Sequence, residues 1–216
     1  MTFFACRQSP KKWPLKIRRL QFNSRLFKVR ASSLEVFMLR EFCGKRPVVP
    51  GSCFVACSAD LVGDITLGEN ANIWYGTVIR GDINSISIGA DTNIQDGSVV
   101  HVDRITGKPG SGAVKIGCNV TVGHRAVIHA CEIGDNCLIG MGAIVLSGAV
   151  VGEGSVLAAG SVVRENEIIP PGSLVAGVPA KIKSQVGPEW QQRLRESAEH
   201  YVSLGRQHKN STRVLE

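Results

Sequence analysis

An aliphatic residue recurs at every sixth position through most of this chain, and no other feature constrains the fold as strongly. Neither an α-helix nor an alternating β-strand has this period. A six-residue period suits a triangular coil in which each side is a short strand with one aliphatic side chain pointing inward. The series is Val55, Leu61, Leu67, Ile73, Ile79, then Ile88, Ile94, Val100, then Ile116, Val122, Ile128, and after one five-residue step Ile133, Ile139, Val145, Val151, Leu157, Val163, Ile169 and Val175.

The composition agrees with a core of small and β-branched side chains. Aromatic residues make up only 6% of the chain, whereas 24 residues are glycine. Glycine often follows the aliphatic residue directly, as at Gly89 and Gly117, where a small residue relieves crowding at a corner. The sequence therefore predicts an all-β solenoid of hexapeptide repeats.

The period is broken from Arg80 to Ser87 and again from Val102 to Lys115. We expect both segments to be loops that leave the coil. Turn-forming residues support the second loop, namely Gly107, Pro109, Gly110 and Gly112.

A helix is expected at the C-terminus, because Pro188 can open one whose apolar residues share a face. These residues are Trp190, Leu194, Ala198, Tyr201 and Leu204. A solenoid cannot bury its ends alone, so we expect the C-terminus to cap the last coil, with the helix packed along the prism. The expected domains are an N-terminal segment (1–34), a lead-in (35–54), the β-helix (55–183) and the C-terminal helix with its tail (184–216).

Counting the repeats assigns each histidine to a side of the prism. Ile88, Ile94 and Val100 occupy sides one, two and three, and Ile116, Val122 and Ile128 occupy the same sides one coil later. His101 and His129 each follow a side-three aliphatic residue. They are therefore expected to stack about 4.8 Å apart, close enough for two imidazoles to share one metal ion.

His124 lies on side two and cannot easily complete that site within one chain. Three prisms around a three-fold axis would bring side two of one chain to side three of the next. We therefore expect a trimer in which His124 completes a site begun by His101 and His129 of a neighbour. A single histidine is usually structural, but three in matching register favour a metal site.

The same count places other polar residues beside the histidines. Arg80 falls in register with His101 and His129, whereas Gln95 and Asp96 fall in register with His124. We expect an Arg80–Asp96 ion pair across the seam between subunits, and Gln95 placed to hydrogen-bond a metal-bound water. His200 and His208, on or after the terminal helix, are expected to be solvated.

The N-terminal segment holds most of the excess charge. The chain carries a net charge of +7, yet residues 1–34 contain nine Lys or Arg and no acid, which leaves 16 basic against 18 acidic residues elsewhere. Nucleic-acid binding by the folded part is therefore poorly supported. A basic, acid-free start predicts a mitochondrial targeting segment, and the alternative is a retained arm that docks onto a membrane surface or a partner.

Seven cysteines in no CxxC arrangement argue against a disulfide framework, and we expect free thiols. A cysteine-based zinc site is the less favoured alternative. No run of about 20 apolar residues is present to span a bilayer.

Several motifs occur together in this sequence, and together they are specific. They are Arg80-Gly81-Asp82, Thr92-Asn93-Ile94-Gln95-Asp96, His101, and Val122-Gly123-His124 through His129. On these motifs, the chain from about Val55 to the C-terminal helix resembles the γ-class carbonic anhydrases. The resemblance implies a left-handed parallel β-helix with a C-terminal α-helix, assembled as a trimer.

The resemblance also implies a metal and an activity. The implied ligands are His101, His124 and His129, and the metal is zinc, with iron or cobalt as alternatives. Three neutral nitrogens leave room for a water whose pKa the metal lowers to about 7, so that hydroxide can hydrate carbon dioxide to bicarbonate. Gln95 would orient the hydroxide and Asn93 would help to place the substrate. Tyr201 matches a family tyrosine near the metal, and the residues implied to organise the seam are Arg80, Asp82 and Asp96.

The sequence departs from fully active members of that family at three places. Ile83 stands where they can carry a glutamate, and Val102-Asp103-Arg104 lacks the acidic cluster that relays protons. Ser203 stands where an asparagine often follows the family tyrosine. The metal ligands are unchanged, so these departures imply slow proton export and reduced activity.

The basic N-terminus and the shortened loop look most like the mitochondrial γ-carbonic anhydrase subunits of respiratory complex I. This implies a peripheral protein on the matrix side of the inner membrane, in a homo- or heterotrimer with related chains that contacts membrane-arm subunits. A structural subunit that keeps zinc but has lost useful turnover is the main alternative. A hexapeptide acyltransferase is less favoured, because three ligands in register have no use there.

Overall fold

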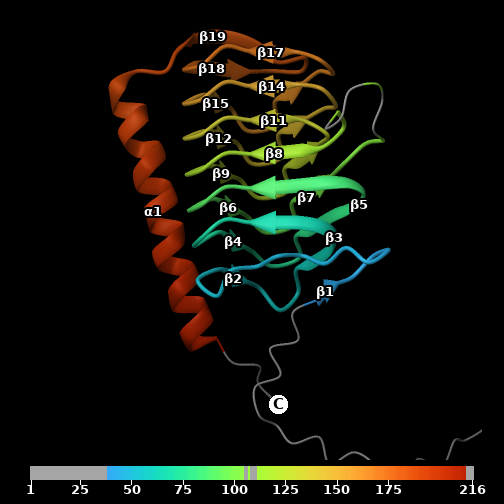
Figure 1. Ribbon diagram of the computed structural model, residues 1–216. Coiled ribbons are helices and arrows are strands. Elements are labelled where there is room, and N and C mark those ends of the chain that lie inside the picture. Colours follow the sequence, from blue (N-terminus) through green and yellow to red (C-terminus); the bar gives the residue numbers. More distant parts are fainter. Residues whose placement is uncertain (1–37, 105–106, 108–110, 213–216) are drawn as a thin grey trace, which may run out of the picture. The chain divides into compact units, whose positions relative to one another are not determined.

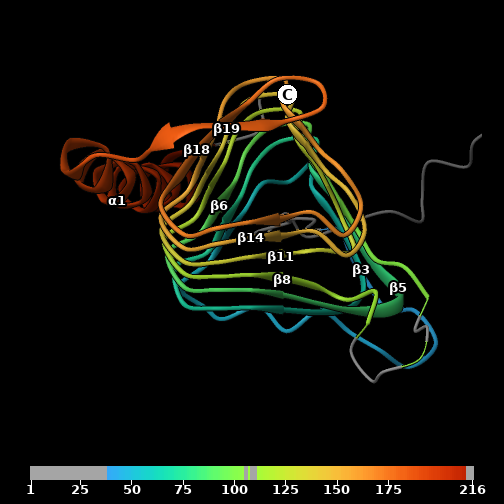
Figure 2. The same ribbon diagram turned by 90° about the horizontal axis from the view of Figure 1, so that it is seen from above.

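The computed structural model describes residues 38–104, 107 and 111–212. These residues form a parallel β-helix of triangular cross-section with a single α-helix beside it (Figures 1 and 2). The expected targeting or docking segment, residues 1–34, lies outside the described residues. The division of the chain at residues 34, 54 and 183 stays a prediction.

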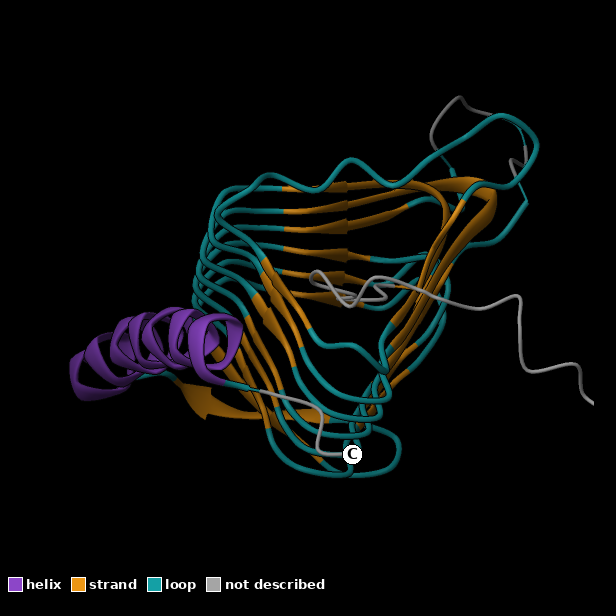
Figure 3. Cartoon of the chain, turned by 90° about the horizontal axis from the view of Figure 1, so that it is seen from below, coloured by secondary structure: helices purple, strands orange, loops and turns teal. Residues whose placement is uncertain are grey.

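Side two forms one eight-stranded sheet, and the α-helix lies beside it in Figure 3. Its strands are β2 (Phe54–Val55), β4 (Asn72–Ile73), β6 (Asn93–Ile94), β9 (Thr121–Val122), β12 (Leu138–Ile139), β15 (Val156–Leu157), β18 (Ser173–Ala176) and β19 (Lys181–Gln185).

Sides one and three form a single eleven-stranded sheet, because two long strands continue around the corner between them. The long strands are β3 (Asp60–Leu67) and β5 (Val78–Ile88), with β1 (Met38–Arg40) paired to β3. Side three continues with β7 (Val99–His101), β10 (Val127–His129), β13 (Ile144–Val145) and β16 (Val162–Val163). Side one continues with β8 (Val114–Ile116), β11 (Glu132–Ile133), β14 (Val150–Val151) and β17 (Ile168–Ile169).

The six-residue series forms the core, as predicted. Every aliphatic residue of the series is buried, and none is more than 4% exposed. One such side chain per side in each coil fills the prism, so the interior is a column of stacked aliphatic layers.

The expectation of a loop from Arg80 to Ser87 is wrong. The segment is the middle of β5 and pairs with β3, whose register shifts between Gly63 and Ile65. Gly63 and Gly81 permit this, because a Cβ on Gly63 would lie only 2.2 Å from the Gly81 carbonyl oxygen. Between β7 and β8 the described residues contain no strand, and β8 begins at Val114, within the expected second loop.

The C-terminal helix, α1 (Pro188–Ser211), begins at the predicted proline but does not cap the last coil. It runs along side two and contacts β2, β4, β6 and β9 (Figure 1). The last strand of side two is β19, which pairs antiparallel with β18. The reason is geometric: the apolar stripe of a 24-residue helix needs a long surface, and the outer face of side two supplies one.

The expectation that His208 is solvated is also wrong. Its Nδ1 lies 3.0 Å from the Tyr75 hydroxyl, and its ring packs against Trp74 and Phe54. Lys209 donates to the carbonyl oxygens of Gly51 and Cys53. These contacts fix the end of α1 to the first coils, across a sequence separation that no local pattern reveals.

All cysteines of the described part are free thiols. Burial raises the pKa of Cys131 and of Cys137 to about 12, so both are small core residues rather than reactive groups. No helix of the described part is long and apolar enough to cross a membrane.

Candidate metal site

His101 and His129 stack as the repeat count predicts. They are register partners at the ends of β7 and β10, with ring centroids 5.3 Å apart. Nδ1 of His101 lies 3.3 Å from Nε2 of His129. Two nitrogen ligands about 2.1 Å from one tetrahedral zinc ion would lie about 3.4 Å apart, so this pair fits two positions of a zinc site.

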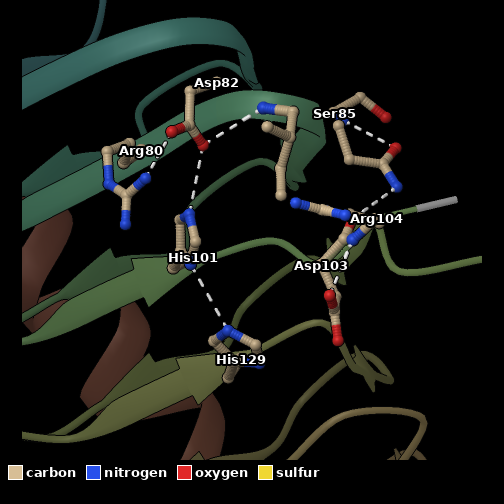
Figure 4. Close-up of polar contacts among 9 residues, drawn as sticks. Arg80, Asp82, Ser85, His101, Asp103, Arg104 and His129 are labelled. Atoms are coloured by element: carbon tan, nitrogen blue, oxygen red, sulfur yellow. Dashed lines mark hydrogen bonds and ion pairs between the residues drawn. The ribbon is translucent and has the colours of Figure 1, made fainter.

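The second nitrogen of each ring has its own partner. Nε2 of His101 lies 3.1 Å from Oδ1 of Asp82 (Figure 4). Nδ1 of His129 lies 2.9 Å from the Ser147 hydroxyl. Metal-bound histidines usually hydrogen-bond through the nitrogen that does not face the metal, because this fixes the ring and its tautomer. Both rings have that arrangement.

Asp82 links the histidine column to Arg80, which is the register partner of His101. Burial alone would raise the pKa of Asp82, but hydrogen bonds from His101 and Arg80 outweigh it and lower the pKa below its usual value. Asp82 is therefore a carboxylate at neutral pH. Within one chain Arg80 contacts Asp82, and the expected Arg80–Asp96 pair across a seam stays a prediction.

His124 follows β9 on side two, away from the other two histidines. Its Nδ1 lies 2.9 Å from Oδ2 of Asp96, so this ring too has a carboxylate on one nitrogen. The His124 side chain is 43% exposed, which leaves it accessible to a neighbouring chain.

A cavity of about 580 Å³ opens beside His124, between side two and α1. Its polar lining residues are Gln95, Thr121, His124, Ser197 and Tyr201, and most of the remaining lining is apolar. Gln95 is buried and donates to Asn93 Oδ1 at 3.0 Å. Burial raises the pKa of Tyr201, and the Asp96 carboxylate raises it further, so the phenol stays protonated at neutral pH.

The single chain thus carries two groups of the predicted residues on different sides. Side three holds Arg80, Asp82, His101 and His129, whereas side two and α1 hold Asn93, Gln95, Asp96, His124 and Tyr201. In residues 38–104, 107 and 111–212 of one chain, no three His, Cys, Asp or Glu side chains lie close enough together to hold a metal ion. The three-histidine site stays a prediction that needs a second chain.

Ser147 was not among the predicted site residues, because it belongs to no motif. One signal in the sequence concerns this place: the five-residue step from Ile128 to Ile133 contains His129.

Comparison with known proteins gives consistent relatives. The model of the family described as bacterial transferase hexapeptide (six repeats) matches residues 113–145 and 130–165. The probable carbonic anhydrase of Methanocaldococcus jannaschii is 49% identical over 150 residues, covering 69% of this chain and 91% of that protein. Gamma carbonic anhydrase 2, mitochondrial, of Arabidopsis thaliana is 44% identical over 166 residues, covering 76% of this chain. The matched region spans only 59% of the length of the Arabidopsis protein.

A solved structure agrees with the fold. The hexapeptide transferase family protein from Anaplasma phagocytophilum superposes with a TM-score of 0.73 at 44% identity, covering 79% of this chain and 97% of that one. The similarity to the Methanocaldococcus protein extends over nearly all of that protein's length. The chain therefore belongs to the γ-carbonic anhydrase family of hexapeptide-repeat proteins.

Proposed function

We propose that the chain is a metal-dependent carbonic anhydrase, or an anhydrase-like subunit, that hydrates carbon dioxide to bicarbonate at the seams of a trimer. The observation that carries this proposal is the stacked pair of His101 and His129, whose facing nitrogens lie 3.3 Å apart while both other nitrogens are held. Zinc suits three imidazole ligands, with iron or cobalt as alternatives. When bound, the metal supplies the activated nucleophile for hydration.

The side-two group would hold the substrate. Carbon dioxide is small and uncharged, and the cavity beside His124 is lined mainly by apolar atoms. Gln95 and Asn93 are fixed by their mutual hydrogen bond, and Asn93 also donates to the Thr121 hydroxyl at 2.9 Å. The protonated Tyr201 phenol can donate a hydrogen bond into the same space. Gln95 and Tyr201 would orient the substrate with little rearrangement, and Asn93 would hold the Gln95 side chain in place.

A second copy of this chain is the partner we propose at side three. Outward-facing aliphatic residues form one column beside the histidines, namely Val78, Val99, Val127, Ile144 and Val162. Val78 and Val99 are 36% and 39% exposed in the single chain. An apolar column of this kind on a sheet face suits burial against another subunit. Related chains could replace one or two copies in a mixed trimer.

We also propose a location in the cell and partners for this chain. Mitochondrial relatives and the basic N-terminus support a mitochondrial location, on the matrix side of the inner membrane, with membrane-arm subunits of respiratory complex I as partners.

Removal and return of the metal test the catalytic proposal. Protein stripped with a chelator is expected to hydrate carbon dioxide at the uncatalysed background rate in stopped-flow measurements. Adding back zinc, iron or cobalt should restore turnover. Loaded protein that stays at background while retaining one metal per chain would instead support the structural alternative, for which Ile83 in place of an acidic residue is the favouring observation. Protein with no stoichiometric metal would favour an acyltransferase.

A further inference from the structure

One corner of the solenoid is a residue shorter than the corner stacked on it. From Ile128 to Ile133 the chain takes five residues, whereas from Val145 to Val151 in the next coil it takes six. Ile128 pairs with Val145 before the corner, and the amide of Gly148 donates to the Ala130 carbonyl within it. Two residues of the longer corner, Leu146 and Ser147, therefore lie opposite a single residue of the shorter corner, His129.

This mismatch brings the Ser147 hydroxyl to the histidine. Leu146 follows Val145 as His129 follows Ile128, which leaves Ser147 as the additional residue, with its hydroxyl 2.9 Å from His129 Nδ1. The backbone on either side is fixed, because the Asn166 amide donates to the Ser147 carbonyl and Gly148 is held by Ala130. Ala130 adopts a left-handed conformation with φ of 46°, as Gly148 does with φ of 74° in the corner stacked on it.

We propose that Ser147 is a positioning residue for His129: its hydroxyl oxygen accepts the Nδ1 hydrogen and so keeps Nε2 free for the metal. The inference rests on the proposed function, because it concerns the metal of the same site. A neutral imidazole carries one hydrogen, and a partner at Nδ1 decides which nitrogen has the lone pair. Ser147 does for His129 what Asp82 and Asp96 do for the other two histidines.

All three histidines share one pattern of hydrogen-bond partners. Each of the three histidines has one nitrogen within 3.1 Å of an oxygen atom, and these oxygens come from three separate segments of the chain. For His129 the partner is supplied by a departure from the repeat, at the one corner where the aliphatic series takes a five-residue step. Core packing alone gives no reason to shorten that corner.

Zinc affinity of the full chain, measured by competition with a chromophoric chelator, tests the role. Ser147→Ala is expected to bind zinc roughly 10-fold more weakly than the unaltered protein, the usual effect of losing a partner of a metal-bound histidine. Ser147→Thr keeps the hydroxyl and should bind zinc about as tightly as the unaltered protein. Ser155→Ala is the matched control, because Ser155 donates to the Pro170 carbonyl at 3.1 Å and contacts no histidine. It should lower stability without changing zinc affinity.

Cobalt loading adds a spectroscopic readout. The visible absorption of cobalt(II) is expected to change in Ser147→Ala and not in Ser155→Ala, because only the former removes a hydrogen-bond partner of a proposed ligand, His129. Unaltered affinity and spectrum in Ser147→Ala would overturn the inference, as would equal weakening in Ser147→Ala and Ser147→Thr. The proposed function fails separately, if the unaltered protein binds zinc tightly and hydrates no carbon dioxide. Unaltered protein that binds no zinc would overturn both.

Discussion

Replacing His124 with alanine is expected to weaken zinc binding by the assembled protein at least about 100-fold and to reduce carbon dioxide hydration to background. A structural zinc site is worth roughly 10–16 kcal/mol shared among four ligands, so one ligand accounts for about 3 kcal/mol, which corresponds to at least about 100-fold in affinity. Chelator competition and stopped-flow hydration measure the two effects.

The loss should not come from unfolding. The His124 side chain is 43% exposed and its Nδ1 contacts only the equally exposed Asp96 carboxylate, so its removal leaves no cavity in the core. His200→Ala is the matched control, because His200 is an exposed histidine on α1. In metal-free protein, both variants should unfold at the same denaturant concentration as the unaltered protein. An H124A protein that keeps full zinc affinity would remove His124 from the ligand set.

A methyl group at Gly89 is expected to destabilise the solenoid by about 2–3 kcal/mol, because coils stack there through backbone alone. A Cβ on Gly89 would lie 2.5 Å from the carbonyl carbon and oxygen of Gly117 and 2.6 Å from the Cys118 amide nitrogen. Backbone atoms in a paired coil cannot move aside as a flexible side chain can. The free energy of unfolding from denaturant titration gives the magnitude of the effect for Gly89→Ala.

Gly51 provides the comparison. A Cβ there meets nothing within 4 Å, and its backbone does not need the left-handed conformation. Gly51→Ala should change the free energy of unfolding by less than about 0.5 kcal/mol. Equal free energies of unfolding for the two variants would contradict the claim that backbone contacts between coils at Gly89 leave no room for a methyl group.

The core and the histidine register were predictable because each depends on a count along the chain. Once six residues make one side, Val100 and Ile128 must be neighbours in adjacent coils, and so must His101 and His129. The same count separates His124 from them. Local chemistry also predicted the start of the helix at Pro188.

Features that depend on contacts between distant segments were not predictable in this way. The strand through Arg80–Ser87 exists because Gly63 lets β3 approach Gly81, which the interrupted period does not reveal. The Tyr75–His208 contact joins the first coils to the end of the helix. The unequal length of two corners could be counted in the sequence, but only the stacked coils show that it brings Ser147 to His129.

Mixing two inactive variants tests most directly whether the metal site spans two chains. His101→Ala chains and His124→Ala chains, each expected to lack a complete site, would be unfolded and refolded together in equal amounts. Random trimers then restore the full ligand set at about one quarter of the seams, because one neighbour must supply His101 and the other His124. Zinc content and carbon dioxide hydration are therefore predicted to recover to about one quarter of the level of the unaltered protein. Mixed trimers with no recovery above either variant alone would contradict a site shared between subunits.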